Sequence, residues 1–301
     1  MSPRSVVALT TGVLLLGVAT LRAGAQTTSR PSTLRASIWN FAQTPLGRMR
    51  AVVLTPSQLA PGERLPLLVA LHGWGETLRG VDRGALGWSR DYELGASDAE
   101  LRRQPLRAEA FLGFVDADRF GRLRRDLAAR PYRGLVVVAP FTPDVLDADA
   151  GTLQHAFDAW VVSELVPRAR RELPVLRERE ATGIDGVSLG GLHALEIGLA
   201  HPETFGVVGA LQPAVRNRVD RVLARYSPSA SRPVQRVRLV TSHVDVYRRD
   251  VTALDVAMRA RGIEHDVRVV AGPHDYVFNR GPGGVEMLLF HDRALRGLRA
   301  E

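Results

Sequence analysis

The sequence predicts an α/β fold in which a mostly parallel, doubly wound sheet is covered by helices on both faces. Two continuous apolar runs, 65–71 and 134–140, have the composition of strands buried on both sides. Segment 149–173 carries apolar residues at helical spacing, and strand and helix patterns alternate from there onward. Segment 181–203 adds a strand, a sharp glycine-rich turn and an apolar helix in direct succession. Such alternation is typical of an α/β domain.

The individual elements follow from the same patterns. Strands at 37–41 and 48–55 flank the turn 43–47 and predict an antiparallel hairpin at one edge of the sheet. Later strands are expected at 65–71, 134–140, 181–186, 207–211, 236–242 and 266–271. Later helices are expected at 149–173, 191–200, 214–226, 250–262 and 284–298. With 301 residues and no internal repeat, the sequence predicts a single domain over 37–301.

The stretch 76–133 is longer than a crossover between two strands requires, so it predicts a lid-like helical insertion after the third strand. We expect two or three helices that cover the site. Its aromatic residues, Trp88 and Tyr92 among them, have two possible roles. They could line a substrate cleft, or they could pack the insertion onto the body of the domain.

The first 25 residues differ from the rest of the chain. Arg4 precedes an apolar run, 6–20, and Ala23-Gly24-Ala25 has the small residues of a cleavage site. This order predicts a signal peptide over 1–25, followed by a mobile N-terminus over 26–36. No later run is long enough to span a membrane, so we expect no span in the mature chain. With no cysteine, the sequence fits a bacterial periplasmic or secreted protein.

The formal net charge of +8 raises the question of a nucleic-acid partner. The arginines are, however, scattered among acidic residues at helical spacing, as in 101–110 and 119–133. No interleaved aromatic patch accompanies them. Solvated helix faces explain this pattern better, and no nucleic-acid partner is expected.

The turn at Ser188 predicts a nucleophile. Gly186 and Gly190 stand two residues to either side of the serine, in the pattern G-x-S-x-G. Where a strand turns directly into a helix, the two backbones come too close for a Cβ, and glycine is required. The serine hydroxyl is then held clear of both elements.

The run 65–71 ends in His72-Gly73-Trp74-Gly75, at the edge where a doubly wound sheet binds ligands. We expect the backbone N–H groups of Trp74 and Leu189 to act as an oxyanion hole. Loss of one such donor typically costs about 3 kcal/mol of transition-state stabilisation. His72 itself is predicted to be structural.

A serine nucleophile requires a base, and the base requires an acid to orient it. His274 follows the last predicted strand and is the expected base, with His243 as its rival at the same edge. Asp245 follows the penultimate strand and is the favoured acid. Asp250 is the alternative, although it could instead cap the next helix. No metal-ligand spacing and no phosphate-binding loop occurs, so no metal and no cofactor are predicted.

These segments resemble the esterase branch of the α/β-hydrolase superfamily, which includes esterase D, feruloyl and acetylxylan esterases and the antigen 85 mycolyltransferases. The resemblance rests on LVALHGWG, FDAWVVSELVPRARREL, AGPHDYVF and the long segment from GIDGVSLGG to LQPAV. It implies an α/β-hydrolase fold and the same site residues. The chain departs from the pattern at Pro273 and in its long insertion.

The expected function is a secreted serine hydrolase that cleaves a small-molecule or polymer-borne carboxylic ester through an acyl-enzyme. Two alternatives remain. An acyltransferase would use the same site with an alcohol in place of water, and a binding or envelope protein would retain the fold without catalysis.

Overall fold

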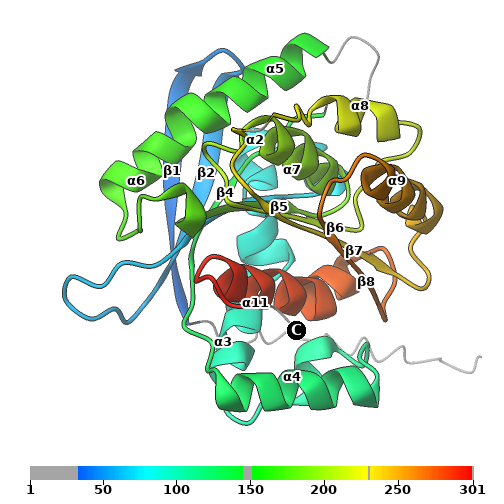
Figure 1. Ribbon diagram of the computed structural model, residues 1–301. Helices are drawn as coiled ribbons and strands as arrows, with labels where there is room; N and C mark the ends of the chain where they lie inside the picture. Colours follow the sequence, from blue (N-terminus) through cyan, green and yellow to red (C-terminus); the bar gives the residue numbers. More distant parts are fainter. Residues whose placement is uncertain (1–32, 145–150, 230, 300–301) are drawn as a thin grey trace, which may run out of the picture.

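The computed structural model describes residues 33–144, 151–229 and 231–299. The eight strands in these ranges form one sheet in the order β1-β2-β4-β3-β5-β6-β7-β8 (Figure 1). The strands are β1 (Leu34–Thr44), β2 (Gly47–Pro56), β3 (Leu67–Leu71), β4 (Val136–Pro140), β5 (Thr182–Gly186), β6 (Val207–Leu211), β7 (Arg236–Ser242) and β8 (Asp266–Val270). Only β1–β2 and β2–β4 pair antiparallel. The predicted α/β fold with a mostly parallel sheet is confirmed.

The helices lie on both faces of this sheet. The longer ones are α3 (Leu94–Arg102), α4 (Ala117–Ala129), α5 (Gly151–Trp160), α6 (Val166–Glu172), α7 (Leu189–Ala200), α8 (Val219–Ala224), α9 (Arg248–Ala260) and α11 (Gly284–Ala294). The short ones are α1 (Trp74–Thr77), α2 (Gly80–Gly84), η1 (Gly87–Asp91), η2 (Ala108–Phe111), η3 (Val161–Leu165), η4 (Arg179–Ala181), α10 (Tyr276–Phe278) and η5 (Asn279–Gly283).

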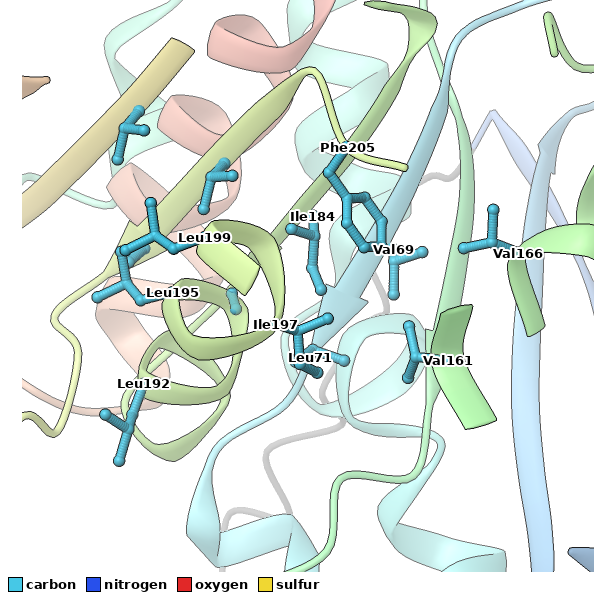
Figure 2. Packing of buried hydrophobic residues seen from close by; sticks show 14 of the residues in the cluster. Val69, Leu71, Val161, Val166, Ile184, Leu192, Leu195, Ile197, Leu199 and Phe205 are labelled. Carbon is cyan, nitrogen blue, oxygen red and sulfur yellow. The ribbon is translucent and has the colours of Figure 1, made fainter. Parts of the chain in front are cut away.

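The apolar strands build two cores, one on each face. Successive side chains of a strand point to opposite faces, and in β3 both sets are apolar. Val69 and Leu71 lie in one core with apolar residues of α5, η3, α7 and α9, and Figure 2 labels Val161 of η3 and Ile197 of α7 in this core. Leu68 and Ala70 face the second core, which α3, α4 and α11 complete. The central strands are therefore buried on both sides, as their composition predicts.

The N-terminal hairpin is longer than predicted. Leu34–Ala36 pair with Leu54–Pro56, so β1 begins three residues before the expected strand. The prediction of a mobile segment over 26–36 is therefore wrong at its end, because those residues complete the edge of the sheet. Residues 26–32 and the predicted signal peptide lie outside the described residues.

Two further expectations differ from the structure. The helix predicted over 214–226 is reduced to α8, because the chain leaves β6 through Pro213 and a left-handed Arg216 with φ 48°. The insertion 76–133 forms several short pieces besides α3 and α4. α3 and α4 lie on the same side of the sheet as α11 (Figure 1), and their buried leucines belong to the same core.

The lid-like role predicted for the insertion is wrong for most of its length. No residue of 93–133 lines the pocket that holds Ser188, and only Glu76 and Tyr92 of the insertion do so. The apolar faces of α3 and α4 are buried against α11, so these helices thicken the domain on one face of the sheet. In the described part of the chain, no helix has the length and apolarity needed to cross a membrane.

Candidate active site

A pocket of about 450 Å³ opens where the central strands end. The chain reaches it from the loops that follow β3, β5, β6, β7 and β8. Its walls include the backbone and side chains of Gly73, Trp74, Ser188, Leu189, Gln212, Arg216, Tyr247, His274 and Tyr276. The pocket therefore stands at the carboxyl edge of the sheet, where doubly wound folds bind ligands.

Ser188 stands at the junction of β5 and α7 in a strained conformation, with φ 55° and ψ −114°. Its N–H donates to the carbonyl of Leu211 at 2.9 Å, and its own carbonyl accepts from the N–H of Ala214 at 2.9 Å. A non-glycine residue at positive φ costs of order 1–3 kcal/mol, so the surrounding structure holds it there. These bonds keep the hydroxyl at the mouth of the turn.

The two flanking glycines are required by close backbone contacts. A Cβ on Gly186 would lie 2.4 Å from the carbonyl oxygen of Gly190. A Cβ on Gly190 would lie 2.4 Å from the carbonyl oxygen of Leu71. Strand, turn and helix therefore approach one another as the sequence pattern predicts.

The structure brings together the three predicted catalytic side chains. His274 Nε2 lies 3.0 Å from Ser188 Oγ, and His274 Nδ1 lies 2.8 Å from Asp245 Oδ1. The Asp245 carboxylate is fully buried, whereas the imidazole is 18% exposed at the pocket. A serine hydroxyl, an imidazole and a carboxylate in this order can move a proton between oxygen and nitrogen.

Neighbouring groups fix both the acid and the base. Asp245 Oδ2 accepts a 2.6 Å hydrogen bond from the Thr241 hydroxyl, and Oδ1 accepts from the Tyr247 N–H at 3.0 Å. The Tyr247 ring packs edge-on against the His274 ring, with centroids 5.1 Å apart. The imidazole is therefore restrained in position by a ring contact as well as by its hydrogen bonds.

The alternatives raised by the sequence lie elsewhere. Asp250 stands in the first turn of α9, and no hydrogen bond within the described ranges joins it to His274. His243 lines a separate hollow beside Arg248. Asp275, next to the base, accepts hydrogen bonds from the N–H groups of Val277 and Phe278 and caps α10.

Trp74 and Leu189 are the first residues of α1 and α7, and both line the pocket. The N–H of a first helical residue has no acceptor within its own helix, so it can serve an oxygen in the pocket. The Trp74 side chain is half-exposed, and its Nε1 donates to Asp144 at 2.7 Å.

His72 behind this turn is buried and structural. Its Nδ1 lies 2.9 Å from the carbonyl of Gly73, to which it donates, and its Nε2 accepts from the Thr142 N–H at 2.9 Å. Burial lowers the pKa of His72 to about 4, so the ring is neutral in these bonds. The imidazole thereby ties the turn after β3 to the end of β4.

The structure gives different places to Trp88 and Tyr92, the two aromatic residues considered for a substrate cleft. Trp88 is fully buried in the second core and does not line the pocket, so of the two roles it has that of packing the insertion onto the domain and not that of lining a cleft. Tyr92 is also buried, but it lines the pocket beside Gly73. The η1 turn places Trp88 under Tyr92, with ring centroids 4.9 Å apart.

Several pocket residues carry no signal in the sequence. Gln212 has φ 44° at the end of β6, and its Nε2 donates to Ser242 Oγ and to the Pro273 carbonyl, both at 2.9 Å. Arg216 Nη2 donates to the Tyr247 hydroxyl at 3.1 Å. Glu76 is a buried carboxylate between two tyrosines. The only exception among them is Gln212, which has a local signal because Pro213 directly after it favours a turn at this point.

Within the described ranges, no group of three or more histidine and acidic side chains is placed to hold a metal ion.

Part of the chain matches a known protein family. A family model described as "Putative esterase" matches residues 137–278, which include Ser188, Asp245 and His274. No curated protein sequence matches the chain.

Solved structures of similar fold include a ferulic acid esterase and two S-formylglutathione hydrolases. A ferulic acid esterase is 16% identical, with a TM-score of 0.64 over 87% of this chain and 99% of its own. The S-formylglutathione hydrolase of Staphylococcus aureus is 12% identical, with a TM-score of 0.60 over 87% of this chain and 100% of its own. That of Agrobacterium tumefaciens is 17% identical, with a TM-score of 0.58 over 88% and 97%. At these identities the likeness shows the fold.

The chain has the fold of these solved hydrolases. Over residues 137–278 it is similar to the family described as putative esterases, and thus to carboxylic-ester hydrolases.

Proposed function

We propose that the chain hydrolyses a small-molecule or polymer-borne carboxylic ester through an acyl-enzyme on Ser188. The observation that carries the proposal is the pair of contacts of His274, 3.0 Å to Ser188 Oγ and 2.8 Å to Asp245 Oδ1. Asp245 orients the imidazole and stabilises its cation. The N–H groups of Trp74 and Leu189 bind the oxyanion.

The reaction has two halves. Ser188 Oγ attacks the ester carbonyl while His274 Nε2 accepts the hydroxyl proton, and a tetrahedral oxyanion forms. The oxyanion collapses, His274 protonates the departing alcohol, and the acyl group remains on Ser188. Water then attacks the acyl-enzyme with His274 as the base, which releases the carboxylic acid and restores the serine.

Labelling with a fluorophosphonate, followed by peptide mass spectrometry, tests this function without knowledge of the natural ester. We expect the label on Ser188 and p-nitrophenyl acetate hydrolysis in the same preparation, with both lost in Ser188→Ala. Folded protein that takes no label would contradict the proposal and favour a non-catalytic binding protein.

We further propose that the protein is exported, with residues 1–25 removed as a signal peptide. The support is the apolar run before Ala23-Gly24-Ala25. In protein expressed from the full sequence, the same peptide spectra should contain an N-terminus at Gln26. Retention of Met1 in the exported fraction would contradict cleavage.

A further inference from the structure

A hydrogen-bonded group of three side chains lies against the turn that carries Trp74. Tyr92 OH accepts from the Gly73 N–H at 3.1 Å and donates to Glu76 Oε2. Tyr276 OH donates to the other oxygen, Glu76 Oε1, at 2.5 Å. Glu76 and Tyr92 are 1% and 2% exposed, so these bonds are shielded from water.

The group is packed onto both glycines of the turn. A Cβ on Gly73 would lie 3.2 Å from Tyr92 OH, and a Cβ on Gly75 would lie 3.3 Å from Tyr276 OH. Trp74 lies between these two contacts. The peptide that carries the proposed oxyanion donor is therefore hydrogen-bonded to one phenol through Gly73 and lies close to the other at Gly75, and both phenols bind one carboxylate.

The three residues come from distant parts of the chain. Glu76 follows the turn itself, Tyr92 ends the η1 turn of the insertion, and Tyr276 lies two residues after His274. Arg79 extends the chain of contacts, with Nη2 donating to Tyr276 OH at 2.8 Å and Nη1 to Asp91 at 2.9 Å. The group thus joins the oxyanion turn to the loop of the base.

Both phenols keep their protons over the pH range of an assay. Burial, together with the Glu76 charge, raises the pKa of Tyr92 well above its ordinary value. Burial and the hydrogen bond to Glu76 raise the pKa of Tyr276 to about 12. Each phenol is therefore protonated and able to donate near neutral pH.

We infer that Glu76 and Tyr92 are positioning residues that aim the Trp74 N–H at the oxyanion, and that the insertion serves the reaction by supplying Tyr92. Neither side chain needs to touch the ester. The inference rests on the proposed function, since it concerns the oxyanion of that reaction. It gives the first part of the insertion a role in turnover, whereas α3 and α4 pack on α11.

The test compares Tyr92→Phe and Glu76→Gln with Tyr132→Phe. Tyr132 is a matched control, because it also lies in the insertion, is buried, and donates to a carboxylate, Asp98, at 2.9 Å, but does not line the pocket. Loss of a whole oxyanion donor lowers kcat by about 100- to 1,000-fold, so a misaimed donor should lower it by at least about tenfold.

For Tyr92→Phe and Glu76→Gln we expect kcat for p-nitrophenyl acetate to fall by at least about tenfold. KM should change by less than about twofold, because the contacts that bind substrate and transition state equally are not altered. The affinity for a trifluoromethyl ketone, which forms a tetrahedral adduct, should fall in parallel. Amide hydrogen exchange in the peptide that contains Gly73 and Trp74 should become faster. Tyr132→Phe should keep kcat and the exchange rate of that peptide.

Unchanged kcat and inhibitor affinity in Tyr92→Phe, or equal losses in Tyr132→Phe, would overturn the inference. Failure of the proposed function would look different. The wild-type protein would then show no turnover beyond that of Ser188→Ala, while the exchange measurement would still report whether Tyr92 holds the turn.

Discussion

His193 lies in α7, the helix that follows the turn at Ser188 (the elbow), and is fully buried, with Nε2 3.2 Å from the carbonyl of Pro143. Its ring packs edge-on against Phe157 at 5.4 Å. Burial lowers the pKa of His193 to about 3, just as it lowers that of His72 to about 4. Both imidazoles are neutral in the folded protein, and both gain a proton near pH 6.5 once the chain unfolds.

The unfolded chain therefore binds more protons than the folded one below about pH 6.5, and stability falls as the pH falls through that window. Each histidine should remove about 2 kcal/mol between about pH 6.5 and pH 5, since one pKa unit corresponds to about 1.4 kcal/mol. His193→Gln should lose less free energy of unfolding than the wild type over this range in urea titrations. His155→Gln, at an exposed position of α5, should follow the wild type. Equal pH slopes in wild type and His193→Gln would contradict this account.

At the scale of elements, one buried carboxylate joins a helix of the insertion to the sheet. Glu286 of α11 accepts from Arg119 of α4 at 2.7 Å and from Arg238 of β7 at 3.1 Å. Burial opposes the charge of Glu286, but the two guanidiniums hold its pKa below the ordinary value. Arg238 also donates to the Glu286 carbonyl at 2.7 Å. The ionised side chain of Glu286 therefore links α4, α11 and β7 to one another.

Glu286→Ala should lower the free energy of unfolding by about 3–5 kcal/mol, because it removes the buried carboxylate that Arg119 and Arg238 share. Glu172→Ala, which removes a partly exposed i,i+4 pair with Arg168, should cost less than about 1 kcal/mol. Urea denaturation of both variants at neutral pH measures the difference. A loss in Glu286→Ala no greater than that in Glu172→Ala would show that the cluster contributes little.

The sequence locates those elements whose burial shows in local composition. The continuous apolar runs of β3, β4 and β6 and the glycines around Ser188 are local signals, and they place both the sheet and the nucleophile. The prediction of a helix over 214–226 is wrong, because the left-handed conformation of Arg216 depends on contacts outside its own segment. A hydrophobic pattern predicts that α3 and α4 each have a buried face, but it does not predict which element covers that face, here α11.

The same reasoning separates the site residues. His274 and Asp245 follow strands whose ends meet at one edge, so their order in the chain predicts them. Glu76 and Tyr276 lie 200 residues apart, and their contact exists only after the sheet is assembled. No local sequence pattern predicts such a contact.

At the scale of the whole molecule, the pocket is an assembly of loops from much of the chain. The turn after β3, the elbow after β5 and the loops after β6, β7 and β8 each supply one wall. The sheet sets their spacing, and the two cores hold the sheet from both sides. Substitutions in these loops can therefore alter the pocket without disturbing the strands that align them.

The conformation of Ser188 has a kinetic consequence. Val187 N–H is bound to Leu71 in β3 and Ser188 N–H to Leu211 in β6, so the elbow takes shape only when three strands have docked. Contacts within helices form earlier than such distant ones. On dilution from denaturant, we expect far-ultraviolet circular dichroism to recover first and fluorophosphonate reactivity to appear with the slowest phase. Reactivity that rises together with helix content would show that the elbow forms locally. The reactivity of Ser188 therefore reports the last step of folding.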